Sequence, residues 1–173
     1  YQQVGNTPNA TNDILIDLIN VTLTSGGTSL ASLISSSIID PLIIDLGTKG
    51  IALSQLGDGV QFDINADGKL DQIAWNQGED GILAYDFNGD GVINNGSEIF
   101  SPYFGGGHYA SSIVALTTLD SNGDGVIDAK DAAYGKLLVW QDINHDGISD
   151  TGEIAGLTVH GITSISLGAH QYI

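Results

Sequence analysis

Four short segments rich in Asp, Asn and Gly constrain this chain more than any other feature, and they lie at residues 63–71, 86–98, 120–131 and 142–153. Each begins with the order D-x-[DN]-x-[DN]-G, in which the glycine at position 6 permits a sharp bend. Alternate side chains of so tight a loop converge on one point, and Ca²⁺ takes about six to eight oxygen ligands. The sequence therefore predicts loops of EF-hand type that bind about four calcium ions.

The loops at 142–153 and 120–131 follow this pattern most completely. Glu153 closes the first loop at position 12, where a glutamate can bind with both oxygens. Asp131 closes the second loop with a shorter side chain. The predicted ligands, with Ile148 and Val126 acting through their carbonyls, are Asp142, Asn144, Asp146, Ile148, Asp150 and Glu153, and Asp120, Asn122, Asp124, Val126, Asp128 and Asp131. The starts of the two loops are 22 residues apart, a spacing that would allow the loops to pair.

The loops at 86–98 and 63–71 depart from the pattern at their C-terminal ends. In the first, the closing acid Glu98 falls one residue late. The second lacks an acid at position 12, and Glu79 or Asp80 would have to supply one from a distance. The predicted ligands, with Val92 and Lys69 acting through their carbonyls, are Asp86, Asn88, Asp90, Val92, Asn94 and Glu98, and Asp63, Asn65, Asp67, Lys69 and Asp71.

A fifth segment, residues 45–51, keeps the frame of the loops without their acids. Positions 3 and 5 hold Gly47 and Lys49 in place of acidic residues. We do not expect this segment to bind calcium on its own. Lys49 could place its ammonium where an ion would sit, and a plain β-turn between strands at 42–46 and 51–55 is an equally good interpretation.

The charge balance excludes several classes of partner. The chain has 21 acidic residues against four lysines, which gives a formal net charge of −17. Such a charge disfavours nucleic acid and anionic membranes as partners and favours cations. No apolar run reaches the roughly 18 residues of a membrane helix, and no signal peptide is predicted. Cysteine is absent, so disulfides and thiolate chemistry are excluded.

Short aliphatic runs alternate with the Asp-rich loops. Strands are predicted for these runs, at residues 42–46, 82–85, 137–140 and 162–167. Helices are predicted at 109–119, from its apolar spacing, and at 129–134, with Asp128 as N-cap. The mixture predicts an α+β fold of short elements that is organised by the metal loops. Residues 1–40, which contain only three acids, are predicted to be an upstream segment, and residues 41–173 to be the calcium-binding domain.

The boundary between these two regions falls at the Asp40–Pro41 bond. An aspartate β-carboxyl can attack its own backbone carbonyl and close a five-membered anhydride, and the proline nitrogen is a good leaving group once it is protonated. A fold that held the carboxyl in attack geometry would give it a high effective concentration, and a general acid would deliver the proton. Asp40 and Pro41 are therefore candidate reacting residues. The alternative is that Asp–Pro simply begins a turn or a strand.

Several motifs around and downstream of this bond point to one family. They include Asp40-Pro41-Leu42, Gly81-Ile82-Leu83, Asn95-Gly96-Ser97-Glu98-Ile99-Phe100, Asp131-Ala132-Ala133-Tyr134 and Leu138-Val139-Trp140-Gln141-Asp142. On these motifs, the run from Asp40 to about Leu167, roughly three quarters of the chain, resembles the self-processing module of FrpC-type iron-regulated RTX proteins.

This resemblance implies an activity that calcium triggers. It implies that the Asp–Pro bond is cleaved, that the new C-terminal aspartyl group passes through an anhydride, and that the anhydride can then form an isopeptide bond with a lysine amine of another protein. It also implies a secreted or cell-surface bacterial protein that leaves the cell by type I secretion. The family usually has an acid-rich loop just after the scissile bond, and the 45–51 segment departs from that pattern.

Two functions follow from these observations. The first is calcium-triggered self-cleavage, with or without cross-linking to lysine. The second is a structural calcium-binding module of a secreted adhesin or RTX protein that does not cleave itself. A multiple-turnover hydrolase is disfavoured, because no Ser/His/Asp spacing stands out and the histidines are scattered, at His108, His145, His160 and His170.

Overall fold

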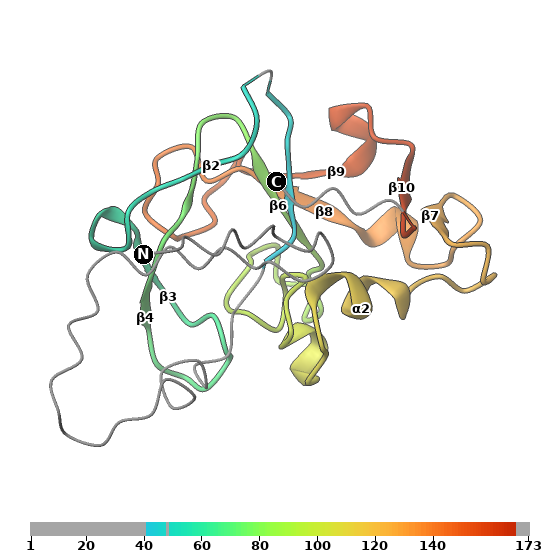
Figure 1. Ribbon diagram of the computed structural model, residues 1–173, viewed down its shortest axis with the longest axis horizontal. Coiled ribbons are helices and arrows are strands. Elements are labelled where there is room, and N and C mark those ends of the chain that lie inside the picture. Colours follow the sequence, from blue (N-terminus) through green and yellow to red (C-terminus); the bar gives the residue numbers. More distant parts are fainter. Residues whose placement is uncertain (1–40, 48, 169–173) are drawn as a thin grey trace, which may run out of the picture. The chain divides into compact units, whose positions relative to one another are not determined.

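The computed structural model of the chain describes residues 41–47 and 49–168, which all lie within one compact unit, Ile38–Ile173 (Figure 1). The strands are β1 (Ile43–Ile44), β2 (Ala52–Leu53), β3 (Val60–Phe62), β4 (Asp71–Ile73), β5 (Asn76–Gln77), β6 (Gly81–Ala84), β7 (Val126–Asp128), β8 (Leu138–Trp140), β9 (Ile154–Gly156) and β10 (Ser164–Ser166). The helical elements are α2 (Ser112–Thr117) and the 3₁₀ turns η1 (Leu56–Asp58), η2 (Phe104–Gly106), η3 (Tyr134–Lys136) and η4 (Leu157–His160).

The predicted α+β class is wrong, because the described part of the chain is rich in β-structure and contains one short α-helix. Helix α2 has six residues and is capped by Ser111, whose Oγ accepts a hydrogen bond from Val114 N–H at 3.3 Å. The helix predicted at 129–134 is instead a series of turns that leads into η3. No helix in the described residues is long and apolar enough to cross a membrane.

Side chains that bind the local backbone explain the missing helix. Asp128 Oδ1 accepts a hydrogen bond from Lys130 N–H at 2.8 Å, and Asp131 Oδ2 accepts one from Asp128 N–H at 3.0 Å. Such bonds offer the backbone an alternative to helical pairing. The same competition acts throughout the Asp-rich loops, and none of the four is flanked by α-helices on both sides. The helix–loop–helix arrangement of an EF-hand is therefore absent from the described residues.

The largest sheet has four antiparallel strands in the order β1-β6-β8-β9. In β6, one of its two central strands, Ile82 pairs with Ile43 on one side and with Trp140 on the other. The remaining strands form the two-stranded sheets β3–β4, β2–β5 and β7–β10. Strands β1, β8 and β10 lie within predicted runs, and β6 begins one residue before its run, so these strand predictions are confirmed.

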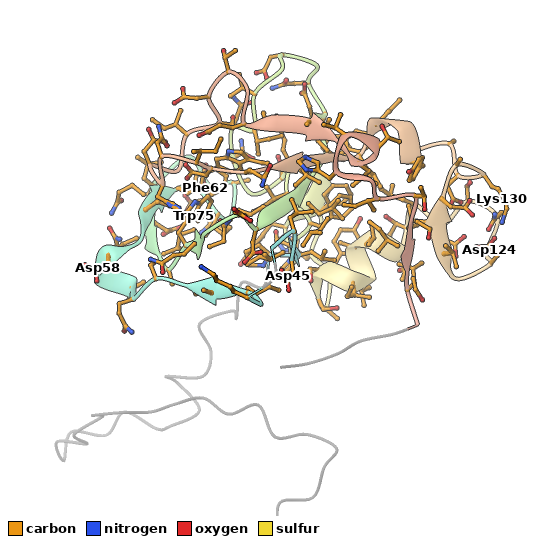
Figure 2. All side chains as sticks on the ribbon, turned by 90° about the horizontal axis from the view of Figure 1, so that it is seen from above. Asp45, Asp58, Phe62, Trp75, Asp124 and Lys130 are labelled. Carbon is orange, nitrogen blue, oxygen red and sulfur yellow. The ribbon has the colours of Figure 1, made fainter. Side chains whose placement is uncertain are left out.

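Two hydrophobic cores lie on opposite faces of this sheet. Successive side chains of a strand point to opposite faces, and accordingly Leu83 and Val139 join one core while Ile82 and Trp140 join the other. The first core also receives the buried face of α2, through Ala115 and Leu116. The second is built around three aromatic rings, and the centroids of Trp75 and Trp140 are 5.3 Å apart in a T-shaped contact. Figure 2 shows Phe62 beside Trp75 in this second core.

Candidate functional site

The four Asp-rich loops share one backbone geometry. In each, the aspartate at position 1 accepts a hydrogen bond through Oδ2 from the N–H of the glycine at position 6. The pairs are Gly68 to Asp63 (2.9 Å), Gly91 to Asp86 (2.8 Å), Gly125 to Asp120 (2.9 Å) and Gly147 to Asp142 (2.8 Å). These glycines have φ between 76° and 85°, the left-handed region that glycine adopts without strain. The repeated spacing therefore produces the repeated bend that the sequence predicts.

Positions 3 and 5 continue the same turn in every loop. The oxygen at position 3 accepts a hydrogen bond from the N–H of position 5, and the carboxylate at position 5 accepts one from the N–H of position 7. The acceptors at position 3 are Asn65, Asn88, Asn122 and Asn144, and those at position 5 are Asp67, Asp90, Asp124 and Asp146. The N–H donors at position 7 are those of Lys69, Val92, Val126 and Ile148.

The side chains at positions 5 and 9 meet at the centre of two loops. In loop 142–153, Asn144 Nδ2 donates to Asp146 Oδ2 at 2.9 Å and to Asp150 Oδ2 at 3.2 Å. In loop 86–98, the equivalent amide of Asn88 donates to Asp90 Oδ2 and to Asn94 Oδ1, each at 2.9 Å. A single electropositive amide thus draws together oxygens from two positions of the loop.

The closing acids complete three of the loops. Each accepts one hydrogen bond from the N–H of position 9 and another from the N–H of position 2, and each is buried. The pairs of donors are Asn94 and Phe87 for Glu98, Asp128 and Ser121 for Asp131, and Asp150 and Ile143 for Glu153. Glu98 therefore fills the same place as the other two closing acids, although it is one residue late in sequence.

Loop 63–71 has no such closing acid. It connects the hairpin strands β3 and β4, and Asp71 at position 9 has its Oδ2 atom buried without a hydrogen-bond partner. The predicted alternatives are Glu79 and Asp80, and their carboxylates lie beside Gly47. They are close to the place that a side chain on Gly47 would occupy. Among the described residues, no hydrogen bond or ion pair joins either carboxylate to loop 63–71, so their closing of this loop stays a prediction.

The side-chain amide of Asn94 lies close to two carboxylates of loop 86–98. Asn94 Oδ1 faces Glu98 Oε2 and Asp90 Oδ2, each at 3.1 Å. If the Asn94 amide is turned over, its NH₂ group donates to both carboxylates. If it is not turned over, a hard cation bound between the three oxygens would satisfy them. Among the described residues, no three acidic or histidine side chains form a metal site by themselves. Amide oxygens and backbone carbonyls would therefore have to complete each coordination shell.

A lysine partly neutralises the loop at 120–131. Lys130 Nζ lies 3.1 Å from Asp124 Oδ2 and 3.3 Å from Asp128 Oδ2, and Figure 2 shows Lys130 beside Asp124 at one end of the molecule. The hydrogen bond from Lys130 lowers the pKa of Asp124, and the two carboxylates raise the pKa of Lys130. The ammonium would compete with a metal ion for these two predicted ligands.

Three of the four loops are joined to one another. The Ser149 hydroxyl accepts a hydrogen bond from Ile93 N–H at 2.7 Å and donates one to Ile93 O at 3.3 Å, which links position 8 of loop 142–153 to position 8 of loop 86–98. Gly96 N–H donates to Asp63 O at 2.7 Å and thereby joins loop 63–71. Loop 120–131 pairs instead with β10, so its predicted pairing with loop 142–153 is wrong.

A buried tryptophan that the sequence did not indicate holds a predicted ligand. Trp75 Nε1–H donates to Asp142 Oδ2 at 2.6 Å, across 67 residues of sequence. A buried indole N–H requires an acceptor, but nothing in the spacing identifies which one. Trp140 Nε1–H makes a longer contact of 3.5 Å with Glu153 Oε2. Both tryptophans therefore contact the carboxylates at the two ends of loop 142–153.

The chain just after the predicted scissile bond is fixed to the base of loop 86–98. Asp40 lies outside the described residues, and the described chain begins at Pro41. Leu42 N–H donates to Phe100 O at 2.8 Å, and Leu42 O accepts from Leu83 N–H at 2.9 Å. Leu83 and Phe100, which flank loop 86–98, also bond to each other at 3.1 Å. One residue next to Pro41 is thus tied to both ends of an Asp-rich loop.

Comparison with known proteins identifies a family and a relative that resemble this chain. The SPM domain family matches residues 42–172. Iron-regulated protein FrpA of Neisseria meningitidis serogroup C is 42% identical over 135 residues, which are 75% of this chain. The match covers 12% of the length of FrpA, so the similarity concerns one part of that much longer protein.

Proposed function

Because this chain belongs to the SPM domain family of iron-regulated proteins, we propose that it cleaves its own Asp40–Pro41 bond in response to calcium. The residues that would hold calcium are the predicted ligands of the four Asp-rich loops. The proposal rests on the position of Leu42, which follows the reacting pair and is hydrogen-bonded to both ends of loop 86–98. Any change that orders this loop also fixes the chain beside Pro41.

The proposed cleavage needs only groups of the chain and one proton. A β-carboxylate oxygen of Asp40 attacks the backbone carbonyl carbon of the same residue, and a C–O bond forms. The C–N bond to Pro41 breaks, and its electron pair stays on the nitrogen, which takes up a proton and becomes the new N-terminus. The remaining five-membered anhydride is opened by water to two carboxyl groups, or by a lysine amine to an amide with loss of a proton.

Bound calcium would supply positive charge that offsets the repulsion among the carboxylates of each loop. The role of the chain's own residues is positional. Leu42 is hydrogen-bonded to Phe100 and Leu83, and β1 pairs with β6, so the chain directly after Pro41 is fixed to the sheet and limits how far the leaving nitrogen can move. When the leaving group is fixed, fewer relative positions of the carboxyl and the carbonyl are possible. The effective concentration of the attacking carboxyl is therefore higher.

The same logic suits a protein that is made inside a bacterium and works outside it. Acidic loops that need calcium to close stay open where calcium is scarce, because metal affinity and folding are coupled. Export to a calcium-rich medium would then start the reaction. We therefore place the activity at the cell surface or in the medium, after type I secretion, with lysine amines of other proteins as acceptors.

Cleavage can be tested with chain purified in the presence of a chelator. Addition of millimolar calcium chloride should convert it, on a denaturing gel, into fragments of 40 and 133 residues, since the bond lies after residue 40 of 173. The variant Asp40→Ala should stay intact. Bands above the mass of the intact chain would report lysine ligation.

One observation favours the alternative of a structural module that does not cleave itself. Segment 45–51 follows the scissile bond closely and has Gly47 and Lys49 in place of acids. An intact chain that melts at a much higher temperature with calcium than without it would support this alternative and contradict self-cleavage.

A further inference from the structure

Three asparagines of this chain are followed directly by glycine, in the pairs Asn88–Gly89, Asn95–Gly96 and Asn122–Gly123. Because glycine has no side chain, the backbone nitrogen after each of these asparagines is easy to approach. That nitrogen can attack the side-chain amide carbon of the asparagine and close a five-membered succinimide ring. The same pair of residues thus occurs in three places, and the surroundings of each pair determine whether the ring can form.

The first and third pairs occupy positions 3 and 4 of their loops, and all four residues are exposed. A Cβ atom on Gly89 or Gly123 would meet no atom within 4 Å. The side-chain carbonyl of each asparagine accepts a hydrogen bond from the N–H two residues further on, at 2.8 Å for Asn88 and 2.9 Å for Asn122. Such a donor stabilises the negative charge that develops on this oxygen during the attack. Figure 2 shows Asp124, which provides the donor for Asn122, at one end of the molecule.

Ring closure removes the hydrogen of the attacking nitrogen, so its cost depends on the hydrogen bond that this N–H makes. Gly89 N–H donates to Asp86 Oδ1 and Gly123 N–H donates to Asp120 Oδ1, each at 2.7 Å. Both contacts are exposed to solvent. Water can therefore replace the lost donor at either carboxylate, and ring closure leaves no buried group without a partner.

The pair Asn95–Gly96 has the same chemistry in a closed environment. Its side-chain carbonyl also accepts a hydrogen bond from the N–H two residues further on, at 3.0 Å. Gly96 is buried, however, and a Cβ atom on it would overlap Ile64 O, so the backbone of another loop packs directly against this glycine and hinders the rotation that ring closure needs. Its N–H donates to Asp63 O at 2.7 Å. Loss of that N–H would leave the carbonyl of a buried residue without this donor, which is costly.

We propose that Asn88 and Asn122 are sites of spontaneous deamidation in the folded protein and that the fold protects Asn95. The glycine nitrogen loses its proton to solvent and bonds to the side-chain amide carbon, and ammonia leaves with a proton taken from solvent. Water then opens the succinimide at one of its two carbonyls, which yields aspartate or isoaspartate. The whole reaction consumes one water molecule and releases one ammonia molecule, and it needs no oxidant or reductant.

The other two Asp-rich loops carry a side chain where these loops have the reacting glycine. Position 4 is Ala66 in one and His145 in the other, each with a φ of 58°. A side chain at this position hinders the attack of its nitrogen, so the modification is confined to loops 86–98 and 120–131. Aspartate at position 3 still fits the loop pattern, whereas isoaspartate inserts an extra carbon into the backbone and displaces the ligand. This consequence for calcium binding rests on the proposed function, but the deamidation itself does not.

The test follows the three asparagines over time in the full-length Asp40→Ala chain, which lacks the reacting carboxyl. One sample stays folded in calcium chloride, as checked by circular dichroism, and another is unfolded in urea with chelator. Peptide mapping by liquid chromatography and mass spectrometry separates asparagine, aspartate and isoaspartate at each site. Division of each rate in the folded chain by the rate in urea removes effects of local sequence. We expect this ratio to be at least about tenfold higher for Asn88 and Asn122 than for Asn95.

The variant Gly89→Ala in this background is a matched control, because Ala66 occupies the same bend of a neighbouring loop with a positive φ. Conversion at Asn88 should become at least about tenfold slower, and the rate at Asn122 should not change. A misfolded variant would reveal itself by losing the protection of Asn95. Gly123→Ala makes the same comparison in the other loop.

One common ratio at the three sites would overturn the proposal, because it would mean that deamidation requires the whole chain to unfold. The absence of conversion at Asn88 and Asn122 in the folded chain, over a time in which urea converts both, would overturn it as well. Neither measurement requires the chain to cleave itself. Self-cleavage and deamidation can therefore fail independently of each other.

Discussion

Single carboxylates in this protein replace the backbone partners that a helix would have provided. Asp131 is an example, because Oδ2 accepts a hydrogen bond from Asp128 N–H at 3.0 Å and Oδ1 accepts one from Ser121 N–H at 2.8 Å. These bonds favour the ionised carboxylate, and the bond from Asp128 N–H contributes most to a lowered pKa of Asp131. The ionised form of this one side chain thus holds the two ends of loop 120–131 together.

The lowered pKa of Asp131 predicts a dependence of stability on pH. A carboxyl group with a lower pKa in the folded chain than in the unfolded chain, where it is about 3.9, stabilises the fold above that value. This contribution is lost as the pH falls through the lowered pKa. We expect Asp131→Asn to melt below the parent at neutral pH, and the gap to narrow as the pH falls below about 4. Thermal melts at constant free calcium measure this gap, and a gap that stays constant would contradict the assignment.

The two tryptophans offer a matched pair of substitutions. Trp75 and Trp140 are both almost fully buried in the same core, but only Trp75 makes a short hydrogen bond to a carboxylate. A hydrogen bond to a charged group contributes roughly 1.5–3 kcal/mol. We therefore expect Trp75→Phe to lower the free energy of unfolding by about 1–2 kcal/mol more than Trp140→Phe does. Urea titration of the calcium-loaded chains measures both losses, and equal losses would mean that the bond to Asp142 contributes nothing.

Contacts within a loop were predictable, whereas contacts across the fold were not. The bonds of Asp86, Asn88 and Asp90 to backbone N–H groups span five residues or fewer, so their spacing in the sequence is sufficient to indicate them. The bond between Trp75 and Asp142 spans 67 residues and depends on the packing of a whole core. The position of Glu79 and Asp80 beside Gly47 was missed for the same reason, because it follows from the register of β1 on β6.

At the scale of elements, the Asp-rich loops are the main structural units and the strands connect them. Loop 63–71 closes the β3–β4 hairpin, loop 86–98 follows β6, and loop 142–153 joins β8 to β9. Ser149 links the last two loops through both backbone groups of Ile93 and is 6% exposed. A change in the stability of one of these loops should therefore change the stability of the other.

Removal of the Ser149 hydroxyl tests this coupling. Ser149→Ala leaves the buried N–H of Ile93 without an acceptor, and an unsatisfied buried donor costs about 1–3 kcal/mol. We expect a loss of stability of this size in the calcium-loaded chain and a shallower calcium titration, since the two loops would then respond independently. Ser166→Ala, at an exposed strand position, serves as the control and should change stability by less than about 0.5 kcal/mol. An unchanged titration slope would show that the loops are not coupled through Ser149.

The fold class was mispredicted because side chains compete for the backbone N–H groups that a helix would use. The spacing of apolar residues does not reveal this competition. The run 129–134 has helix-forming alanines, but Asp128 and Asp131 bind backbone N–H groups of the same segment. Isolated helices this short have little stability of their own, because nucleation is costly. Strand runs such as Leu138–Trp140 were predicted correctly, since their apolar side chains fill two cores at once.

At the scale of the whole molecule, a large negative charge opposes the packing of the two cores. The described residues hold most of the acids, and Lys130 and Lys69 are the cations paired with them there. Self-repulsion of this kind destabilises a compact state. Apolar burial favours the same state. We expect the outcome to depend on whether cations are available to the loops, and this expectation follows from the excess of acidic residues over lysines.

The chain that would remain after cleavage keeps both hydrophobic cores. The two cores described above lie between Leu42 and Leu167, and the family match begins at residue 42. Residues 1–40 carry three of the 21 acids and none of the four lysines, so a chain that begins at Pro41 keeps 18 acids and a formal charge of −14. We expect this shortened chain to fold only when calcium is present and to melt close to the calcium-loaded Asp40→Ala chain, because its cores are complete.

Salt can distinguish two causes of this dependence on calcium, which are metal coordination and charge repulsion. Concentrated sodium chloride screens the carboxylates from one another but provides no ion that suits a shell of six to eight oxygens. If coordination organises the loops, salt with chelator should leave the shortened chain unfolded by circular dichroism, and calcium should fold it at low salt. Folding in salt alone would mean that charge repulsion, rather than metal coordination, is what calcium relieves. A melting curve that is identical in chelator and in calcium would mean that the hydrophobic cores are sufficient without either.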